Sequence, residues 1–184
     1  MSTSNQSQLN QWLSKDLAYT YHCSPFIKRL FEADKALEQF SLQHISHPFS
    51  RQEMESWLDS RRISDEISLN KSLRILRQQV IANIILRDLN KLADLDEVLK
   101  SVTALAEITL IHAHQFHFNF LKSMHGSPIG LNGKEQQLSI VAMGKLGGAE
   151  LNVSSDIDLI FAYPEEGDTK SNASISNQSF FIKL

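Results

Sequence analysis

The chain has 184 residues, of which 42% are hydrophobic and 21% are charged, and its net charge is −3. This balance is close to that of ordinary globular domains, which argues against a disordered or fibrous protein. Because Lys and Arg are not in surplus, the composition also disfavours binding of nucleic acid through its phosphates.

Membrane insertion and secretion are not indicated. No apolar run approaches the roughly 20 residues that cross a bilayer, and the N-terminus lacks a basic region followed by an apolar one. The single cysteine, Cys23, cannot form an internal disulfide, which agrees with a reducing compartment. We expect Cys23 to be a passive small side chain. The sequence therefore predicts a cytoplasmic protein without membrane contacts.

The first helical stretch is predicted between Ser24 and Phe40. Ser24 can accept a hydrogen bond as the N-cap, and Pro25 suits the first helical position. Apolar residues then recur at helical spacing. They are Phe26, Leu30, Ala33, Leu37 and Phe40. A second, short helix is predicted after Ser50, because Ser50 and Glu53 have the spacing of a capping box.

Two long helices are predicted next. The first runs from about Asp65 to Leu92, because apolar residues lie three to five positions apart with charges between them. These residues are Leu69, Leu73, Leu76, Val80, Ile84 and Leu89. Asp94 and Glu97 mark the start of the second helix, which should continue to about Phe120. The first two thirds of the chain are therefore predicted to be helical.

The pattern changes in residues 125–136, where three glycines and a proline interrupt the helical spacing. We interpret this stretch as the boundary between a helical region, residues 1–124, and a second region, residues 137–184. Two short apolar runs in the second region, residues 138–143 and 156–163, are typical of strands. The predicted fold class is α+β.

An acidic segment follows the second predicted strand. Its charged residues include Glu165, Glu166 and Asp168. We interpret it as a solvated loop, which could also contribute contacts to a substrate or partner. Beyond it, Ser176 can begin another helix.

Two aspartates, Asp156 and Asp158, stand at the start of the second predicted strand. In a strand they share one face, with their backbones roughly 6.5 to 7 Å apart, while Ile157 and Leu159 face the core. Two carboxylates placed so close repel each other unless a cation offsets them. Mg²⁺ suits the pair, because it prefers oxygen ligands and is usually held by one or two carboxylates together with phosphate oxygens. The pair is therefore a candidate metal site.

Three glycines, Gly144, Gly147 and Gly148, precede the aspartates. Glycine permits positive φ and close approach of a ligand, and successive amides in such a turn can bind an anion. Lys145 could add a charge to a bound phosphate, or could simply be solvated. The spacing fits neither a Walker A loop nor a dinucleotide-binding fingerprint. The glycines and aspartates together indicate a nucleotide site, whereas the alternative is a turn before a solvated strand end.

The full string MGKLGGAELNVSSDIDLIFAYPE, beginning at Met143, resembles the nucleotidyltransferase motif of the glutamine synthetase adenylyltransferase/adenylyl-removing enzyme family. It is most similar to the first of the two catalytic halves of that family. The helical sequence before it has a similar Leu-Arg-Asp-Leu and Leu-Ala-Asp-Leu texture. The resemblance covers residues 65–167.

This resemblance implies a polymerase-β-like nucleotidyltransferase fold behind a helical N-terminal region. Asp156 and Asp158 would be catalytic ligands of Mg²⁺ or Mn²⁺, and Ser155 would contact the nucleotide together with the turn from Gly144 to Gly148. The first half of the enzyme would remove AMP from a tyrosine of glutamine synthetase by phosphorolysis, giving ADP, and the second would add AMP from ATP. A PII-type signal protein would select the direction.

The resemblance also implies a third carboxylate on a later strand, and no such strand is found before Leu184. We therefore expect the chain to be an N-terminal fragment that is incomplete as a catalyst. Two alternatives stay open. The helical part, residues 20–122, could be a non-catalytic interaction module, or the motif could belong to a nucleotidyltransferase for another acceptor.

Other residues that could carry chemistry have simpler explanations. His112, His114 and His117 lie in one predicted helix, where only His114 and His117 could converge on a metal. We therefore do not predict zinc. Trp12 and Trp57 are interpreted as packing residues.

Overall fold

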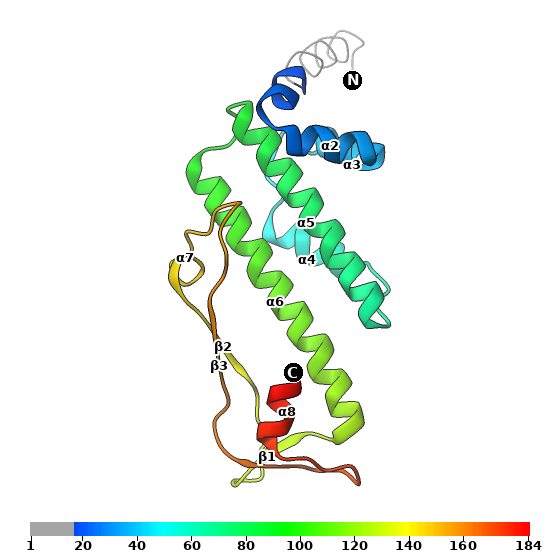
Figure 1. Ribbon diagram of the computed structural model, residues 1–184, viewed down its shortest axis with the longest axis vertical. Coiled ribbons are helices and arrows are strands. Elements are labelled where there is room, and N and C mark those ends of the chain that lie inside the picture. Colours follow the sequence, from blue (N-terminus) through cyan, green and yellow to red (C-terminus); the bar gives the residue numbers. More distant parts are fainter. Residues whose placement is uncertain (1–16) are drawn as a thin grey trace. The chain divides into compact units, whose positions relative to one another are not determined.

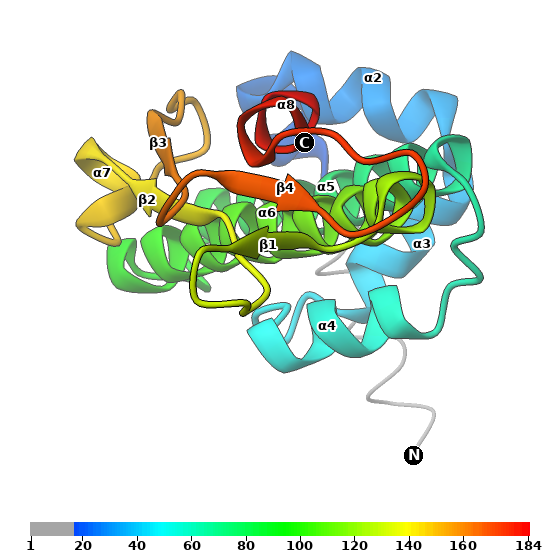
Figure 2. The same ribbon diagram turned by 90° about the horizontal axis from the view of Figure 1, so that it is seen from below.

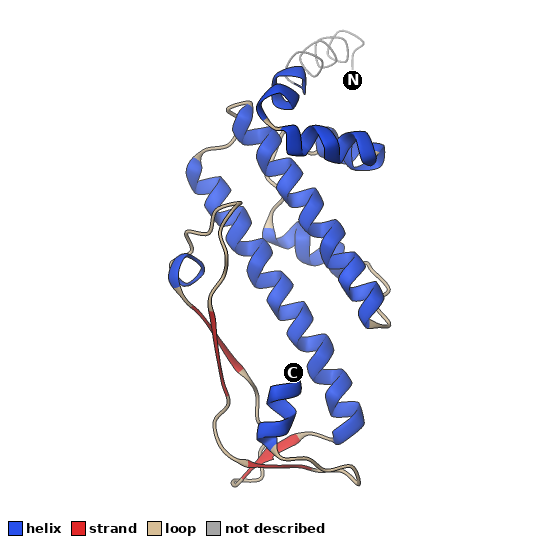
Figure 3. Ribbon diagram, viewed as in Figure 1, coloured by secondary structure: helices blue, strands red, loops and turns tan. Residues whose placement is uncertain are grey.

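The structure, a computed structural model, describes residues 17–184 (Figure 1). The chain divides into two compact units, Met1–Leu105 and Ala106–Leu184. Helices dominate, and the strands form small antiparallel two-stranded sheets (Figure 3). The predicted α+β class is confirmed. Trp12, interpreted as a packing residue, lies outside the described residues.

The first predicted helical stretch is two helices, α2 (Pro25–Ala33) and α3 (Lys35–Gln43). Ser24 caps α2 as predicted, since its side chain accepts from the Ile27 amide at 3.3 Å. The continuous spacing through residue 34 was misleading, because Asp34 ends one helix and begins the next. Its amide donates to the Leu30 carbonyl, and its carboxylate accepts from the Leu37 amide at 3.0 Å.

The buried face of this helix pair is also shifted from the predicted stripe. Phe26 is 46% exposed, whereas Ile27 and Phe31 are fully buried. They belong to a cluster of apolar side chains that draws on α2, α3, the segment after α3 and the next long helix. Its members are Ile27, Phe31, Leu37, Ile45, Ala82 and Leu86.

The capping box before α4 (Arg51–Asp59) is present as predicted. The Ser50 amide donates to Glu53 Oε2 at 2.7 Å, and the Glu53 amide donates to Ser50 Oγ at 3.3 Å. Trp57 of α4 makes a cation–π contact, since the Arg61 guanidinium lies over its ring, 3.9 Å from the centroid.

The two long helices are α5 (Glu66–Leu89) and α6 (Leu95–His125). Asp94 starts α6 as predicted, since its carboxylate accepts from the Glu97 amide at 2.8 Å. The buried Arg87 of α5 ties the turn before α6 to the segment after α3. It donates to both oxygens of Glu97 at 2.6 and 2.8 Å, to the Ile45 carbonyl at 2.6 Å and to the Leu92 carbonyl at 2.8 Å.

The glycine-rich stretch after α6 contains a strand that was not predicted. Gly126 ends α6 with a φ of 80°, a conformation that glycine adopts at low cost. β1 (Pro128–Gly130) then pairs antiparallel with β4 (Gly167–Thr169), which lies in the predicted acidic loop (Figure 2). The division between the two compact units falls after Leu105, within α6, and the domain boundary between residues 124 and 137 stays a prediction.

The second sheet is a hairpin of β2 (Ser139–Ala142) and β3 (Leu159–Ala162). Its register pairs Ala142 with Leu159 and Val141 with Ile160. The final helix, α8 (Asn177–Lys183), begins at Ser176 as predicted, with the Ser179 amide donating to Ser176 Oγ at 3.1 Å. No helix of residues 17–184 has an apolar stretch long enough to cross a membrane.

The core of the second unit lies where α8 meets the C-terminal part of α6. A cluster of buried apolar side chains forms this core, with partly buried apolar residues packed against it. The buried members are Phe118, Leu121, Phe180 and Phe181, and the partly buried ones are Leu138, Tyr163, Ile175 and Leu184. The rings of Phe118 and Phe180 meet edge to face at 5.5 Å between centroids, and those of Tyr163 and Phe181 stack at 4.9 Å. These contacts anchor α8 beside the β2–β3 hairpin.

Candidate active site

The three glycines lie in the single helical turn α7 (Gly144–Gly147) and its C-cap, directly after β2. Gly144 has a φ of 55°, which a residue with a side chain rarely adopts. At Gly147 a Cβ atom would overlap the carbonyl oxygen of Ala142. Gly148 has an ordinary φ of −85° and room for a Cβ. The turn therefore requires glycine at 144 and 147, and positive φ was predicted correctly only for the first.

Backbone hydrogen bonds close this turn on itself. The Gly148 amide donates to Gly144 O at 3.0 Å, and the Glu150 amide donates to Lys145 O at 2.7 Å. Leu146 and Leu151 are both buried and fix the turn to the protein. Lys145 is exposed. The first amides of a helical turn have no acceptor within it, so those of Gly144 to Leu146 are the donors that could meet an anion.

Asn152 organises the segment between the turn and the aspartates, a role that the sequence analysis missed. Its Oδ1 accepts from the Ser154 amide at 3.1 Å and from Ser155 Oγ at 2.8 Å, while its carbonyl accepts from the Ser155 amide at 3.1 Å. The signal was available, because Asn followed two residues later by Ser is typical of a side-chain-stabilised turn. Ser155 is therefore held by Asn152.

The aspartates precede β3 rather than lying in it. The strand begins at Leu159, so the prediction that both carboxylates stand on a strand is wrong in its boundary. The pairing nevertheless continues one residue further, because the Met143 amide donates to the Asp158 carbonyl at 2.9 Å. This bond places Asp158 beside the residue that begins the glycine turn. The two halves of the motif, distant in sequence, are therefore adjacent.

Both carboxylates are exposed, and neither has a hydrogen-bond or ion-pair partner within residues 17–184. By alternation of side chains, Asp158 lies on the face of the hairpin opposite to Leu159. Within residues 17–184, no three His, Cys, Asp or Glu side chains are grouped so that they could hold a metal. Asp156 and Asp158 thus offer two free oxygen ligands next to a turn with free amides.

The remaining candidate residues are not brought to this site. His114 lines a groove on the other side of the hairpin, and its pKa is lowered by burial. In the acidic segment, Tyr163 donates to Glu166 at 3.0 Å, and Asp168 lies in β4. Cys23 is exposed and free.

Comparison with known proteins finds a family model and curated bacterial relatives that match most of this chain. A family model for glutamate-ammonia ligase adenylyltransferase matches residues 14–184. A curated relative from Nitrosomonas europaea is 48% identical over 166 residues, and one from Nitrosomonas eutropha is 46% identical over 166 residues. In both cases the match covers 88% of this chain and 18% of the relative.

A relative from Aromatoleum aromaticum is 42% identical over 172 residues, which is 94% of this chain and 18% of the relative. All three relatives are named bifunctional glutamine synthetase adenylyltransferase/adenylyl-removing enzyme. The chain spans less than a fifth of their length. It belongs to the glutamate-ammonia ligase adenylyltransferase family.

Proposed function

We propose that this chain carries part of the nucleotidyltransferase centre of a bifunctional glutamine synthetase adenylyltransferase/adenylyl-removing enzyme. The reaction would remove AMP from a tyrosine of glutamine synthetase by phosphorolysis, with ATP-dependent addition of AMP by a second centre. The fold around the motif would be that of the polymerase-β-like nucleotidyltransferases. Family membership supports the reaction class, and the relatives' name supports the protein substrate.

One observation carries the assignment of the site: the hydrogen bond from the Met143 amide to the Asp158 carbonyl. It holds Asp158 next to the turn whose first amides can donate to a phosphate. An unpaired carboxylate and free amides side by side can be occupied together by a phosphate and a cation, but not by a phosphate alone, because the phosphate and carboxylate repel each other. The geometry therefore supports a nucleotide phosphate bound with a divalent cation.

The residues present fit Mg²⁺ or Mn²⁺ in kind. Asp156 and Asp158 supply oxygen ligands, and phosphate oxygens and water can complete the coordination. When bound, such an ion neutralises charge that develops on the transferred phosphoryl group. The amides of the turn, with Lys145, would orient the nucleotide phosphates, while Asn152 would keep Ser155 in place beside them.

The chain's own residues divide the work in this scheme. The turn at Gly144 to Gly148, which is fixed by the buried Leu146, would orient the nucleotide phosphates.

In the removal reaction, one bond forms and one bond breaks. A phosphate oxygen forms a bond to the AMP phosphorus, the bond from that phosphorus to the tyrosine oxygen breaks, and ADP leaves while tyrosine recovers its proton. A PII-type protein is proposed to select the direction, and the cytoplasm is the proposed compartment.

Metal binding is tested directly with this chain. We expect Mn²⁺, followed by electron paramagnetic resonance, to bind the parent and the control Asp59→Asn, which removes one exposed carboxylate from α4. The double variant Asp156→Asn/Asp158→Asn should lose binding. Equal binding by parent and double variant would contradict the assignment of the metal site.

The reaction is tested in a full-length family member with the same two substitutions at the aligned positions. With adenylylated glutamine synthetase and phosphate, we expect ADP formation to fall about 100-fold or more, equivalent to roughly 2.7 kcal/mol of transition-state stabilisation. If the unsubstituted protein forms no ADP, another acceptor is indicated. If this chain binds glutamine synthetase and its own double variant binds equally well, the alternative of a non-catalytic interaction module is favoured.

A further inference from the structure

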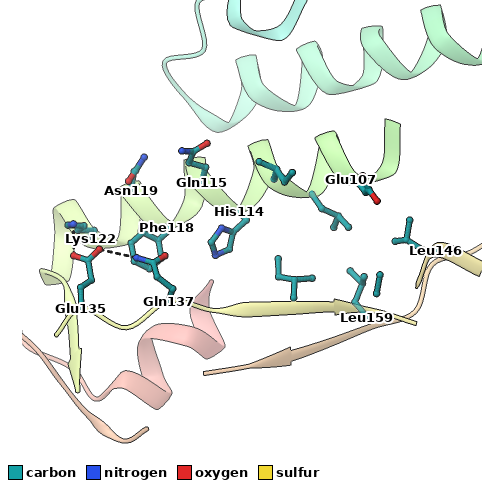
Figure 4. A pocket seen from close by; sticks show the side chains of 14 residues that line it. Glu107, His114, Gln115, Phe118, Asn119, Lys122, Glu135, Gln137, Leu146 and Leu159 are labelled. Atoms are coloured by element: carbon teal, nitrogen blue, oxygen red, sulfur yellow. Dashed lines mark hydrogen bonds and ion pairs between the residues drawn. The ribbon is translucent and has the colours of Figure 1, made fainter. Parts of the chain in front are cut away.

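A groove of about 600 Å³ runs between α6 and the β2–β3 hairpin, within the second unit (Figure 4). One wall is α6, and the other is formed by Ile140 and Ala142 of β2, Leu159 of β3 and Leu146 of α7. By the alternation of side chains, this wall is the face of the hairpin that does not carry Asp158. The groove thus lies on the opposite face of the hairpin from Asp158, and it shares Leu146 with the glycine turn.

The wall on α6 is one continuous helical face. Its lining residues lie three, four or one position apart along four turns of the helix. They are Glu107, Leu110, Ile111, His114, Gln115, Phe118, Asn119 and Lys122. From Glu107 to Lys122 the face extends about 22 Å at roughly 1.5 Å per residue. This length is greater than most small ligands need, and it matches about four turns of a second helix lying alongside α6.

The position of α8 supports a helix as the occupant. Phe180 and Phe181 of α8 pack against Phe118 and Leu121, and Leu184 packs against the same cluster. Phe118 belongs both to this cluster and to the groove. α8 therefore already lies between α6 and the strands at one end of the groove, and a helix within the groove would extend the same layer.

The chemistry of the lining defines the face that such a helix must present. Its middle is apolar, with Ile111, Ile140 and Leu159. Its far end is closed by Lys122, which donates to Glu135 at 2.6 Å, and by Gln137, which donates to Glu135 at 3.0 Å. These three polar groups pair with one another, so the apolar middle of the groove calls for an aliphatic surface. Glu107, Gln115 and Asn119 add polar groups to the wall on α6.

His114 adds a specific requirement. Its ring points from α6 into the groove (Figure 4), and its Nε2 is buried without a hydrogen-bond partner within the described residues. Burial lowers the pKa of this imidazole, so the neutral form is favoured. A neutral imidazole can pair with a hydroxyl or amide group. One such side chain on an otherwise aliphatic face would satisfy it.

We propose that this groove seats an amphipathic helix, supplied by the additional polypeptide that full-length relatives carry directly after the region matching this chain. The chain spans only 18% of those relatives, so they contain ample further sequence. The helix places aliphatic side chains against Ile111, Ile140 and Leu159 and one hydroxyl or amide side chain against His114 Nε2. The proposal does not depend on the metal site.

The test uses a synthetic peptide of about 25 residues, long enough for the groove and a flanking turn on each side. Its sequence is the segment of the Nitrosomonas europaea relative that follows the region matching this chain. Titrated into the isotope-labelled chain, the peptide should gain helical circular dichroism. It should shift the resonances of residues 107–122 and 138–146.

Two variants with nearly equal exposure provide a matched pair. Ile111 is 53% exposed and lines the groove, whereas Phe120 is 54% exposed on α6 outside it. Both side chains are exposed, so glutamate should be tolerated in the fold at either position. Ile111→Glu should weaken binding at least about tenfold because it places a charge against an apolar face. Phe120→Glu should leave binding unchanged.

The role of His114 and the rival occupants are resolved by further measurements. Peptide binding should move the His114 ring resonances, and His114→Phe should remove the preference for a hydroxyl or amide at the facing position of the peptide. Asp156→Asn/Asp158→Asn should bind the peptide like the parent. The proposal is overturned if the peptide does not bind or binds both glutamate variants equally. Concentration-dependent dimerisation that Ile111→Glu abolishes would overturn it too, in favour of a second copy.

Discussion

The two compact units differ in how their polar side chains are paired and in how much apolar surface they leave exposed. In the first, two buried polar side chains are well paired: Arg87 has four short hydrogen bonds, and Asn83 donates to the His44 carbonyl at 2.9 Å, although the buried Ser41 Oγ has no partner among the described residues. In the second, the hairpin leaves Val141 and Ile160 about half exposed. A two-stranded hairpin is marginal by itself. The helical unit is thus held by interactions inside it, whereas the motif-bearing unit has apolar surface that further contacts would stabilise.

The largest expected effect tests the strength of the first unit. Arg87→Ala leaves the Glu97 carboxylate and the carbonyls of Ile45 and Leu92 without their donor, and breaking such a buried pair costs about 3–5 kcal/mol. We expect a loss of this size in the free energy of unfolding, measured by urea denaturation. Arg77→Ala, at an exposed position of α5, should change it by less than about 0.5 kcal/mol.

The tryptophans make this measurement specific to one unit. Trp12 and Trp57 both precede residue 106, so tryptophan fluorescence reports on the first unit. A change at Arg87 should shift the fluorescence transition. If instead the shift appears only in hydrogen exchange of residues 106–184, the comparison between the units is wrong.

A smaller effect is expected at the glycine turn of the second unit. Gly147→Ala forces a Cβ against the carbonyl oxygen of Ala142 and should cost about 1–3 kcal/mol, as overpacking does. Hydrogen exchange of residues 139–151 should then accelerate. Gly148→Ala is the matched control, because its Cβ would meet its nearest atom at 3.6 Å, an ordinary contact. Equal acceleration in both variants would contradict the geometric requirement at 147.

The capping box of α4 should have a still smaller effect. Ser50→Ala removes the acceptor for the Glu53 amide and should lower the free energy of unfolding by about 1 kcal/mol. Tryptophan fluorescence is suitable because Trp57 lies in α4. Gln52→Ala, an exposed substitution in the same helix, should have little effect, and a comparable loss there would show that the effect of Ser50→Ala is not specific to the cap.

The smallest effect is the pH dependence caused by His114. Its folded pKa lies below the ordinary 6.5 because burial disfavours the charged ring. The unfolded chain therefore binds the additional proton first as pH falls below about 7, and stability decreases with falling pH until the folded ring is protonated as well. His114→Phe should flatten the difference between pH 7 and pH 5 in hydrogen exchange of residues 106–184. His22→Phe, at an exposed position, controls for the loss of one imidazole.

Local rules predicted the helices well, because their starts depend on short-range chemistry. The caps at Ser24, Ser50 and Ser176 are all present. Periodicity failed at Asp34, where a side-chain cap interrupts an otherwise continuous pattern. The short strands β1 and β4 were missed because three residues give no alternation to detect, and their pairing is fixed by contacts distant in sequence.

The sequence alone named the residues of the candidate site, whose role stays a prediction, but it did not give their geometry. Glycines and aspartates identified the turn and the carboxylates from their chemistry. The start of β3 at Leu159 depends on the folded backbone, so composition and spacing could not fix it, whereas the turn at Asn152 had a sequence signal that was not used. The groove beside His114 could not be predicted from the sequence either, because it forms only where α6 and the hairpin lie together in space.

The hydrogen bond between Met143 and Asp158 joins backbone atoms only, whereas the proposed metal ligand at residue 158 is the side chain. The bond uses the carbonyl of Asp158 and leaves its side chain uninvolved. The carboxylate can therefore be exchanged for another group without removing the connection that aligns the loop with β3. Related sequences could therefore vary the side chain at residue 158, the proposed metal ligand, while keeping the same backbone connection.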